Sequence, residues 1–276
     1  MKVPQDRHTT LADMGFFRKK KGYVKVSIEQ EYVILIMPLR FRPEVYDIRV
    51  ELLSFCEHFP LGEEDGPGLW WGNQLVEGCY HTMDLIKGME YGRDEETISR
   101  LFDEKIKTIL QSIHDPQSLC QAKLDMDALF GISYCPIDLP IYLGRYDVAR
   151  ELIENNIRAL RQCISWAEAR PKTYEEYIAT FRCPFPEDFP AKKRKSAGGE
   201  ELDEQRKREK FRAYYERTQK DLRDYHQGIE SEHKRIQKIE NGDIEDWKAE
   251  IEERRRINRA YCLENFTEND KKHFVQ

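Results

Sequence analysis

Two short pairs, Cys56-x-His58 and Cys79-x-His81, contain the residue types that most readily hold a metal ion. Thiolates and imidazoles are the usual zinc ligands, and residues two apart on a strand point the same way. Structural zinc sites use Cys-x₂₋₄-Cys spacing, which neither pair has. We therefore interpret the pairs as buried thiols beside surface histidines and predict no metal and no other cofactor. These four residues are the candidates if zinc does bind.

Acidic groups offer a second possible chemistry. Glu63-Glu64-Asp65 and Asp125-x-Asp127 could hold a divalent ion. Short acidic groups are expected by chance in a chain with 51 carboxylates. The sequence has no Gly-x-Ser-x-Gly elbow, no phosphate-binding glycine loop and no His-Glu-x-x-His. An enzyme would need distant residues to converge, such as Glu63 and Glu64 with His58 or His81.

Three basic runs could contact phosphates: residues 18–21, 192–195 and 254–256. The first 190 residues hold 23 basic and 31 acidic side chains, so the larger part of the chain is acidic. From residue 191 onward, 22 basic side chains are interleaved with 20 acidic ones. Mixed charges of this kind are typical of a solvated helix face or a linker, and nucleic-acid binding is an alternative.

A pair of tryptophans, Trp70-Trp71, follows a loop rich in glycine and proline. If the two rings were exposed they would be an interaction hot spot. The other interpretation is that they pack the loop over a sheet.

The elements that must position these residues begin with a sheet over residues 16–56. Lys21-Gly22 separates residues 16–20 from residues 23–28 and indicates a hairpin. Residues 31–41 are apolar and β-branched, which predicts a central strand. Residues 45–55 alternate, which predicts a strand with one wet face. The sequence therefore predicts an antiparallel sheet of three to four strands.

Residues 74–180 change to helical periodicity. We expect helices over 75–89, from Asp94, from Asp115-Pro116 and over 146–166, and a short one that starts at the capping box Thr173-x-x-Glu176. Gly144 is expected at a turn between two helices.

Residues 184–199 have the proline, lysine and glycine content of a linker. A seam with spacings of four and three follows, which predicts a long helix. Asn241-Gly242 is expected to end it, and Asp243-x-x-Asp246 to cap a second helix that packs back as a hairpin. The positions expected to make interactions in this arm are Leu222, Ile229, Ile236, Ile239 and Trp247.

The predicted class is therefore α+β. A body over residues 1–183 is followed by the linker, a helical coiled-coil arm over 200–265 and a tail over 266–276. No apolar run approaches the ~20 residues of a membrane helix. Residues 1–6 lead into no apolar segment, so we expect no signal peptide. Seven widely spaced cysteines indicate reduced thiols and a cytoplasmic location.

The opening segment, residues 11–28, reads Leu-x-x-Met-Gly-Phe-Phe-Arg-Lys-Lys-Lys-Gly. It resembles the start of an uncharacterised bacterial domain-of-unknown-function family, whose members open with a helix, Gly-Phe-x-Lys-Lys-Gly and several strands. Residues 143–152 are similar to a later helix of that family. The resemblance covers at most residues 6–165 and supplies no catalytic residues. It implies a domain of a kind sometimes found near toxin and immunity genes.

The uneven charge composition, the heptad-like seam of residues 200–241 and the lack of catalytic motifs lead to one prediction. The protein is expected to be non-enzymatic and to bind another protein or itself through its arm. The resemblance implies the specific version of an immunity-like or toxin-neutralising assembly. The two alternatives are a metal- or carboxylate-dependent enzyme and a nucleic-acid-binding module.

Overall fold

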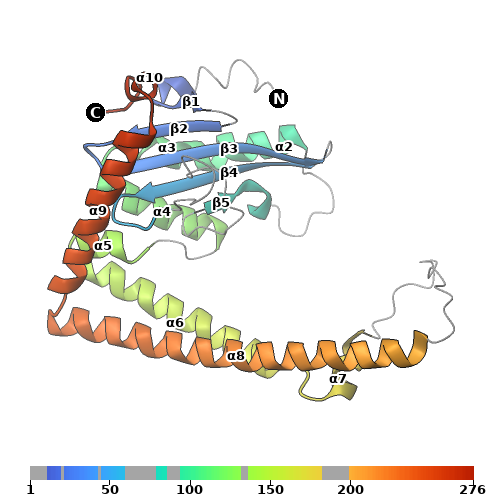
Figure 1. Cartoon of the computed structure of the whole chain (residues 1–276). Helices are drawn as coiled ribbons and strands as arrows, with labels where there is room; N and C mark the ends of the chain where they lie inside the picture. The colour runs from blue at the N-terminus through green and yellow to red at the C-terminus, as the bar shows by residue number, and fades with distance from the viewer. Residues whose placement is uncertain are drawn as a thin grey trace. The chain divides into compact units, whose positions relative to one another are not determined.

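A computed structural model describes residues 11–19, 22–42, 45–59, 79–85, 94–131, 136–181 and 199–276. The chain divides into two compact units (Figure 1). Unit 1 contains residues 1–152 and 238–276, and unit 2 contains residues 153–237. Trp70 and Trp71, the linker 184–199 up to residue 198, and the acidic group 63–65 lie outside the described residues.

A five-stranded antiparallel sheet forms the centre of unit 1, in the order β1-β2-β3-β4-β5. The strands are β1 (Phe17–Lys19), β2 (Gly22–Ser27), β3 (Tyr32–Arg42), β4 (Val45–Ser54) and β5 (Cys79–His81). The first four match the sheet expected from sequence. The fifth lies where a helix over residues 75–89 was expected, and that prediction was wrong: Thr82–Leu85 continues β5 only as a 3-10 turn, η2.

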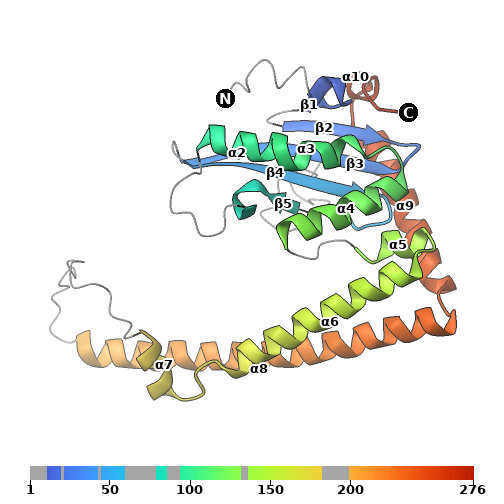
Figure 2. The same ribbon diagram turned by 180° about the vertical axis from the view of Figure 1, so that it is seen from behind.

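Helices cover one face of the sheet, as the view from behind shows (Figure 2). They are α2 (Glu95–Leu101), the π-helical turn η3 (Phe102–Ile106), α3 (Lys107–Gln111) and α4 (Pro116–Phe130). The ammonium of Lys25 on β2 donates to the carbonyl of Ile113 at 3.2 Å. The hydroxyl of Tyr80 on β5 donates to Asp127 of α4 at 2.8 Å. Polar side chains of the strands thus bond to α4 and to the segment between α3 and α4.

Local hydrogen bonds set the starts of these helices as expected. The carboxylate of Asp94 accepts from the backbone N–H of Thr97 at 2.9 Å, and Asp115 accepts from Ser118 at 2.6 Å. Thr173 Oγ1 accepts from the backbone N–H of Glu176 at 3.2 Å. Each bond satisfies a donor that the first turn of a helix leaves without an intrahelical partner.

The remaining helices are α5 (Asp138–Tyr142), α6 (Tyr146–Glu168), α7 (Tyr174–Phe181), α8 (Gly199–Asn241), α9 (Glu245–Asn265) and α10 (Glu268–Lys271). The N-cap of α9 is Ile244, with no side-chain bond, so the expected cap at Asp243 was wrong. Gly242, between α8 and α9, has φ +71°, a left-handed value that ends α8 and that side chains with a Cβ rarely adopt.

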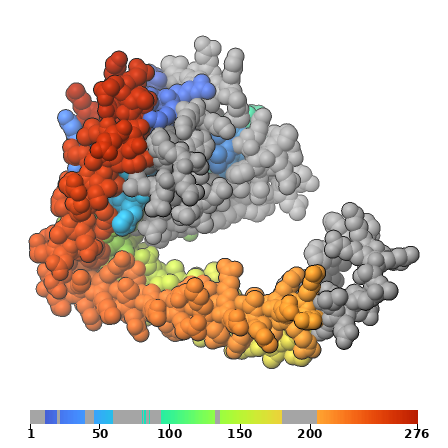
Figure 3. Space-filling view, viewed as in Figure 1, coloured from blue at the N-terminus to red at the C-terminus, as the bar shows by residue number. Residues whose placement is uncertain are grey.

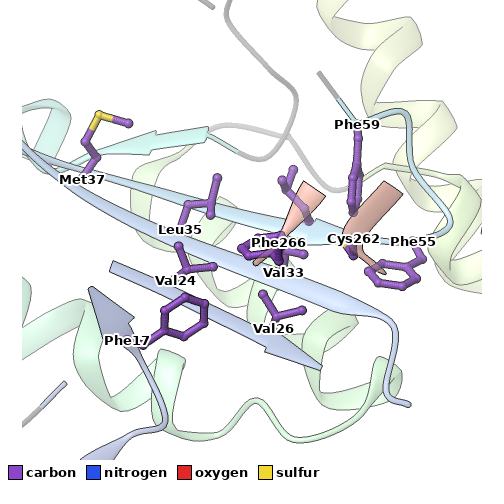
Figure 4. Close-up of a cluster of buried hydrophobic side chains, with 11 residues drawn as sticks. Phe17, Val24, Val26, Val33, Leu35, Met37, Phe55, Phe59, Cys262 and Phe266 are labelled. Atoms are coloured by element: carbon purple, nitrogen blue, oxygen red, sulfur yellow. The ribbon is translucent and has the colours of Figure 1, made fainter. Parts of the chain in front are cut away.

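The second face of the sheet packs against α9 and the chain end. Cys262 and Phe266 join a buried cluster with strand residues of β1 to β4, and Figure 4 shows both side chains reaching it. The apolar side of α9 is therefore buried on the sheet of unit 1. The strand members of the cluster are Phe17, Val24, Val26, Val33, Leu35, Met37 and Leu53, with Phe55 and Phe59 from the segment after β4.

The last residues of the chain close the edge of β2. The backbone N–H of Val275 donates to the carbonyl of Val26 at 2.9 Å, and Val275 forms a parallel bridge with Ser27. Gly15 is needed nearby, because a Cβ there would lie 2.8 Å from Val275 Cγ1. The segment 238–276, expected as part of an arm and a tail, thus belongs to the sheet unit.

The fold is α+β, as expected. Among the described residues, no helix is both long and apolar enough to span a membrane.

Candidate functional site

The expected zinc candidates do not form a common site in the described part of the chain. Cys56 is buried, and burial raises the pKa of its thiol to about 12. His58, two residues on, is exposed. Cys79 and His81 lie on β5, but their side chains are outside the described set. No group of three or more His, Cys, Asp or Glu among the described residues could hold a metal ion.

The polar side of β4 is buried, although the sequence predicted a wet face. Asp47 and Glu51 are at most 2% exposed. The hydroxyl of Thr82 donates to Asp47 at 2.8 Å, and Arg49 pairs with Glu51 at 2.5 Å. These charges are thus held by neighbours from β4 and η2, which is the arrangement expected of buried ionic groups.

A second buried group of charges lies where α4, α5 and α9 meet the turn after β4; we call it the junction cluster. Its central pair is Lys123 of α4 and Glu57, with Nζ and Oε1 2.5 Å apart. Lys123 has no exposed surface and Glu57 is 5% exposed. Burial raises the pKa of Glu57 to about 7, and the charge of Lys123 acts in the opposite direction. The other members are Glu31, Asp138, Arg254, Arg255, Asn258 and Arg259.

Helix α9 supplies the basic members of the junction cluster. Arg255 and Arg259 both pair with Glu31, at 2.5 and 2.6 Å, and Arg254 pairs with Asp138. Glu31 has φ +56°, in the region that favours glycine, and its two ion pairs give a reason for a charged residue at that turn. The basic run 254–256 is therefore largely committed to ion pairs within unit 1.

Asn258 and Trp247 complete the attachment of α9. The Asn258 amide donates to the carbonyls of Phe55 and Glu57, at 2.9 and 2.7 Å. Trp247, expected to be an interaction residue, is 8% exposed, and its indole N–H donates to Asp138 at 2.6 Å. The contacts of Trp247 in this structure thus lie within unit 1. The junction cluster thus anchors α9, and its charges are matched within the protein.

Unit 2 is built from α7 and the greater parts of α6 and α8, which run antiparallel. Leu160 of α6 lies 3.1 Å from where a Cβ on Gly228 would stand, so the two helices approach closely there. Further along, the guanidinium of Arg170 donates to Asp221 at 2.9 Å. Beyond that, Tyr177 of α7 stacks obliquely on Phe211, with centroids 5.5 Å apart.

The seam of α8 therefore has a partner in its own chain. Leu222, Ile229, Ile236 and Ile239 are all half-buried. The first three belong to unit 2, where α6 packs against α8. The sequence predicted the seam of α8, but it did not show that α6 packs against that helix.

The side of α6 that is exposed in unit 2 carries a residue that the sequence reasoning did not single out. Trp166 is 62% exposed, the highest value among the exposed large apolar side chains of the described residues. At helical spacing within α6 it shares its face with Ala159 and Gln162, both exposed and uncharged. Arg170, four residues further along the chain, pairs with Asp221. The signal in the sequence was this spacing of neutral residues around one tryptophan.

No family model, curated protein or solved structure matches this chain.

Proposed function

We propose that the protein is a non-enzymatic binding protein that assembles with another protein through unit 2. The observation that carries the proposal is Trp166, which is 62% exposed in the last turn of α6 beside the uncharged, exposed Gln162. Tryptophan is enriched among the residues that dominate binding energy, and charged residues are depleted at the centre of interfaces. The partner that fits is a protein with an apolar, uncharged groove that accepts the indole.

The exposed area of Trp166 sets the scale of the interaction. A tryptophan side chain buries up to ~250 Å², and apolar burial contributes about 25 cal/mol per Å². Burying the exposed 62% of Trp166 would therefore contribute about 2–4 kcal/mol. That is enough to change the dissociation constant by at least a factor of ten.

The location and the biological setting belong to the same proposal. Cys56, Cys120, Cys163 and Cys262 are free thiols, which favours a reducing compartment and so the cytoplasm. The resemblance of residues 11–28 suggests the specific version of an immunity-like member of a defence or toxin-neutralising assembly. The packing of α8 against α6 changes the expected mode of association, because exposed helix faces, and not an open coiled-coil seam, are offered to the partner.

The test is a capture experiment with the full chain in its native host, followed by reconstitution with the purified partner. Trp166→Ala should lose the partner, with at least a tenfold weaker dissociation constant by calorimetry. The matched control is Leu263→Ala on α9, since Leu263 is also a large exposed apolar side chain, at 43%. It should bind as the wild type does.

Light scattering of the purified chain separates the possible partners. A dimer that dissociates in Trp166→Ala would identify a second copy as the partner of this face. Retention of every partner by Trp166→Ala, at unchanged affinity, would contradict the proposal.

A further inference from the structure

The charges of α8 are unevenly distributed along its length. Residues 206–223 carry eight basic and three acidic side chains, whereas residues 224–241 carry three basic and four acidic ones. The basic half lies in unit 2, in a chain whose net charge is −6. Figure 3 shows the described part of α8 in orange as a continuous stretch of surface. A polyanion would be attracted to this half of the helix.

One row of side chains in this region contains no acid. Successive members are three or four residues apart, so they share one face of the helix. Tyr215 is 38% exposed, and Gln219 is half-buried; the other members are all exposed. We call this row the arginine stripe: Arg208, Arg212, Tyr215, Gln219, Arg223 and His226. It runs over residues 208–226, 18 steps along the helix, which is about 27 Å at 1.5 Å per residue.

The packing of unit 2 fixes the direction of the stripe. Phe211, Thr218 and Leu222 are the positions that α8 turns inward, and Phe211 contacts both aromatic rings of α7 that are described there. Arg212 and Arg223 are each one residue on from an inward position, and therefore lie about 100° around the helix from it. Neither guanidinium forms an ion pair within the described part of the chain. Both are available to a ligand.

We infer that the arginine stripe binds the sugar–phosphate backbone of a single-stranded nucleic acid, with Tyr215 as a stacking platform for a base. Arginine donates in a planar fork that matches phosphate oxygens, and an exposed aromatic ring stacks on any base. An acidic protein partner would pair with the arginines, but its binding would not require an exposed aromatic ring such as that of Tyr215. The stripe is on α8 and the Trp166 face is on α6, so this binding is additional to the proposed protein partner and does not depend on it.

The experiment measures the fluorescence anisotropy of labelled 20-nucleotide dT and U strands with the purified full chain, between 50 and 300 mM salt. The two available arginines, Arg212 and Arg223, predict a slope of log affinity against log salt of about −1.4, at roughly −0.7 for each phosphate contact on a single strand; the guanidinium of Arg208 already lies over the Tyr174 ring, 4.6 Å from its centroid. Arg212→Glu with Arg223→Glu should reduce that slope by about 1.4 and weaken binding at 50 mM salt more than tenfold. Comparing dT with U shows which sugar is preferred.

The matched control is Arg206→Glu with Arg217→Glu, which makes the same change of charge on other faces of the same helix. Both of these residues are exposed. The control should keep most of the affinity, since its residues are outside the stripe. Tyr215→Ala should weaken binding by about tenfold with the salt slope unchanged, because stacking releases no counterions.

Three results would overturn the inference. The first is no binding at 50 mM salt. The second is equal loss in the two double variants, which would indicate diffuse attraction to a charged helix. The third combines two observations: polyglutamate of the same charge competes as well as unlabelled dT, and Tyr215→Ala leaves the affinity unchanged. Together they would identify the stripe as a site for acidic polypeptides.

Discussion

Lys123→Met tests the physical account of the junction cluster, because it removes one partner of a fully buried ion pair. Breaking such a pair typically costs about 3–5 kcal/mol, since the remaining charge stays buried. The remaining charge here is Glu57, whose carboxyl can take up a proton instead. The destabilisation should therefore depend on pH, being largest where Glu57 would otherwise be ionised.

The way in which the destabilisation depends on pH follows from the pKa of Glu57. Burial raises it to about 7 in the folded protein, above its ordinary value of 4.5. The contribution of Glu57 to stability is thus fully present below pH 4.5 and is lost as pH rises through 7, by about 1.4 kcal/mol per unit. In Lys123→Met the opposing positive charge is gone, so the pKa rises further and the loss continues above pH 7. In the wild type the contribution of Glu57 to the unfolding free energy should not change with pH above 7.

The assay is urea unfolding of both proteins at pH 5.5, 7.0 and 8.5. At pH 5.5 Glu57 is protonated in both, and the difference in unfolding free energy should be at its smallest. Between pH 7.0 and 8.5 it should grow by about 2 kcal/mol. A control with Glu57→Gln added to Lys123→Met should remove the pH dependence and recover most of the stability. A difference that is the same at all three pH values would refute the reasoning.

Three further variants probe long-range contacts, each by urea unfolding with the wild type as reference. Asn258→Ala should lose at least about 2 kcal/mol of unfolding free energy, because two buried carbonyls lose their donor and each unsatisfied group costs about 1–3 kcal/mol. A loss below about 0.5 kcal/mol would contradict this. Glu31→Gln should lose about 2 kcal/mol, since two arginines lose their counter-charge, and a stability equal to wild type would argue against those pairs. Gly228→Val should destabilise unit 2 by about 1–3 kcal/mol by overpacking Leu160, whereas Gly228→Ala should be close to neutral; equal effects would contradict the close approach.

The parts of the fold that were predicted correctly are those fixed by neighbours in sequence. The caps at Asp94, Asp115 and Thr173 each join residues three positions apart. The strands β2, β3 and β4 follow one another with short turns, and so their pairing is local. Such features need no knowledge of the rest of the chain, which is why composition and periodicity were sufficient.

The placement of α9 could not be predicted in the same way. Its apolar positions would look the same whether the helix faced α8 or the sheet. The deciding contacts join residues about 200 positions apart, such as Asn258 with Phe55 and Arg255 with Glu31. The run 254–256 was interpreted as a surface charge for the same reason, since its acidic partners are far away in sequence.

The candidate surfaces of unit 2 were missed because the sequence reasoning looked for apolar seams. The four seam residues of α8 were correctly identified as apolar positions, and they are half-buried on a helix against which α6 packs at Gly228. The residues that remain exposed on α6 and α8 are ones that the sequence patterns did not single out. They are Trp166 among neutral neighbours, and arginines spaced by three and four. Both patterns can be read from the sequence only after the inward face of each helix is known.

The covered seam also changes which variants can test association. Ile229→Asp or Ile236→Asp places a carboxylate at a half-buried position of α8, in the unit where α8 packs against α6. Such a variant would unfold part of unit 2, and loss of a partner would follow whether or not the seam touches that partner. Trp166→Ala and Arg212→Glu change exposed side chains and leave the packing between α6 and α8 intact. Their effects on binding therefore report on the surfaces themselves, and a variant that loses binding while keeping its unfolding curve locates the contact.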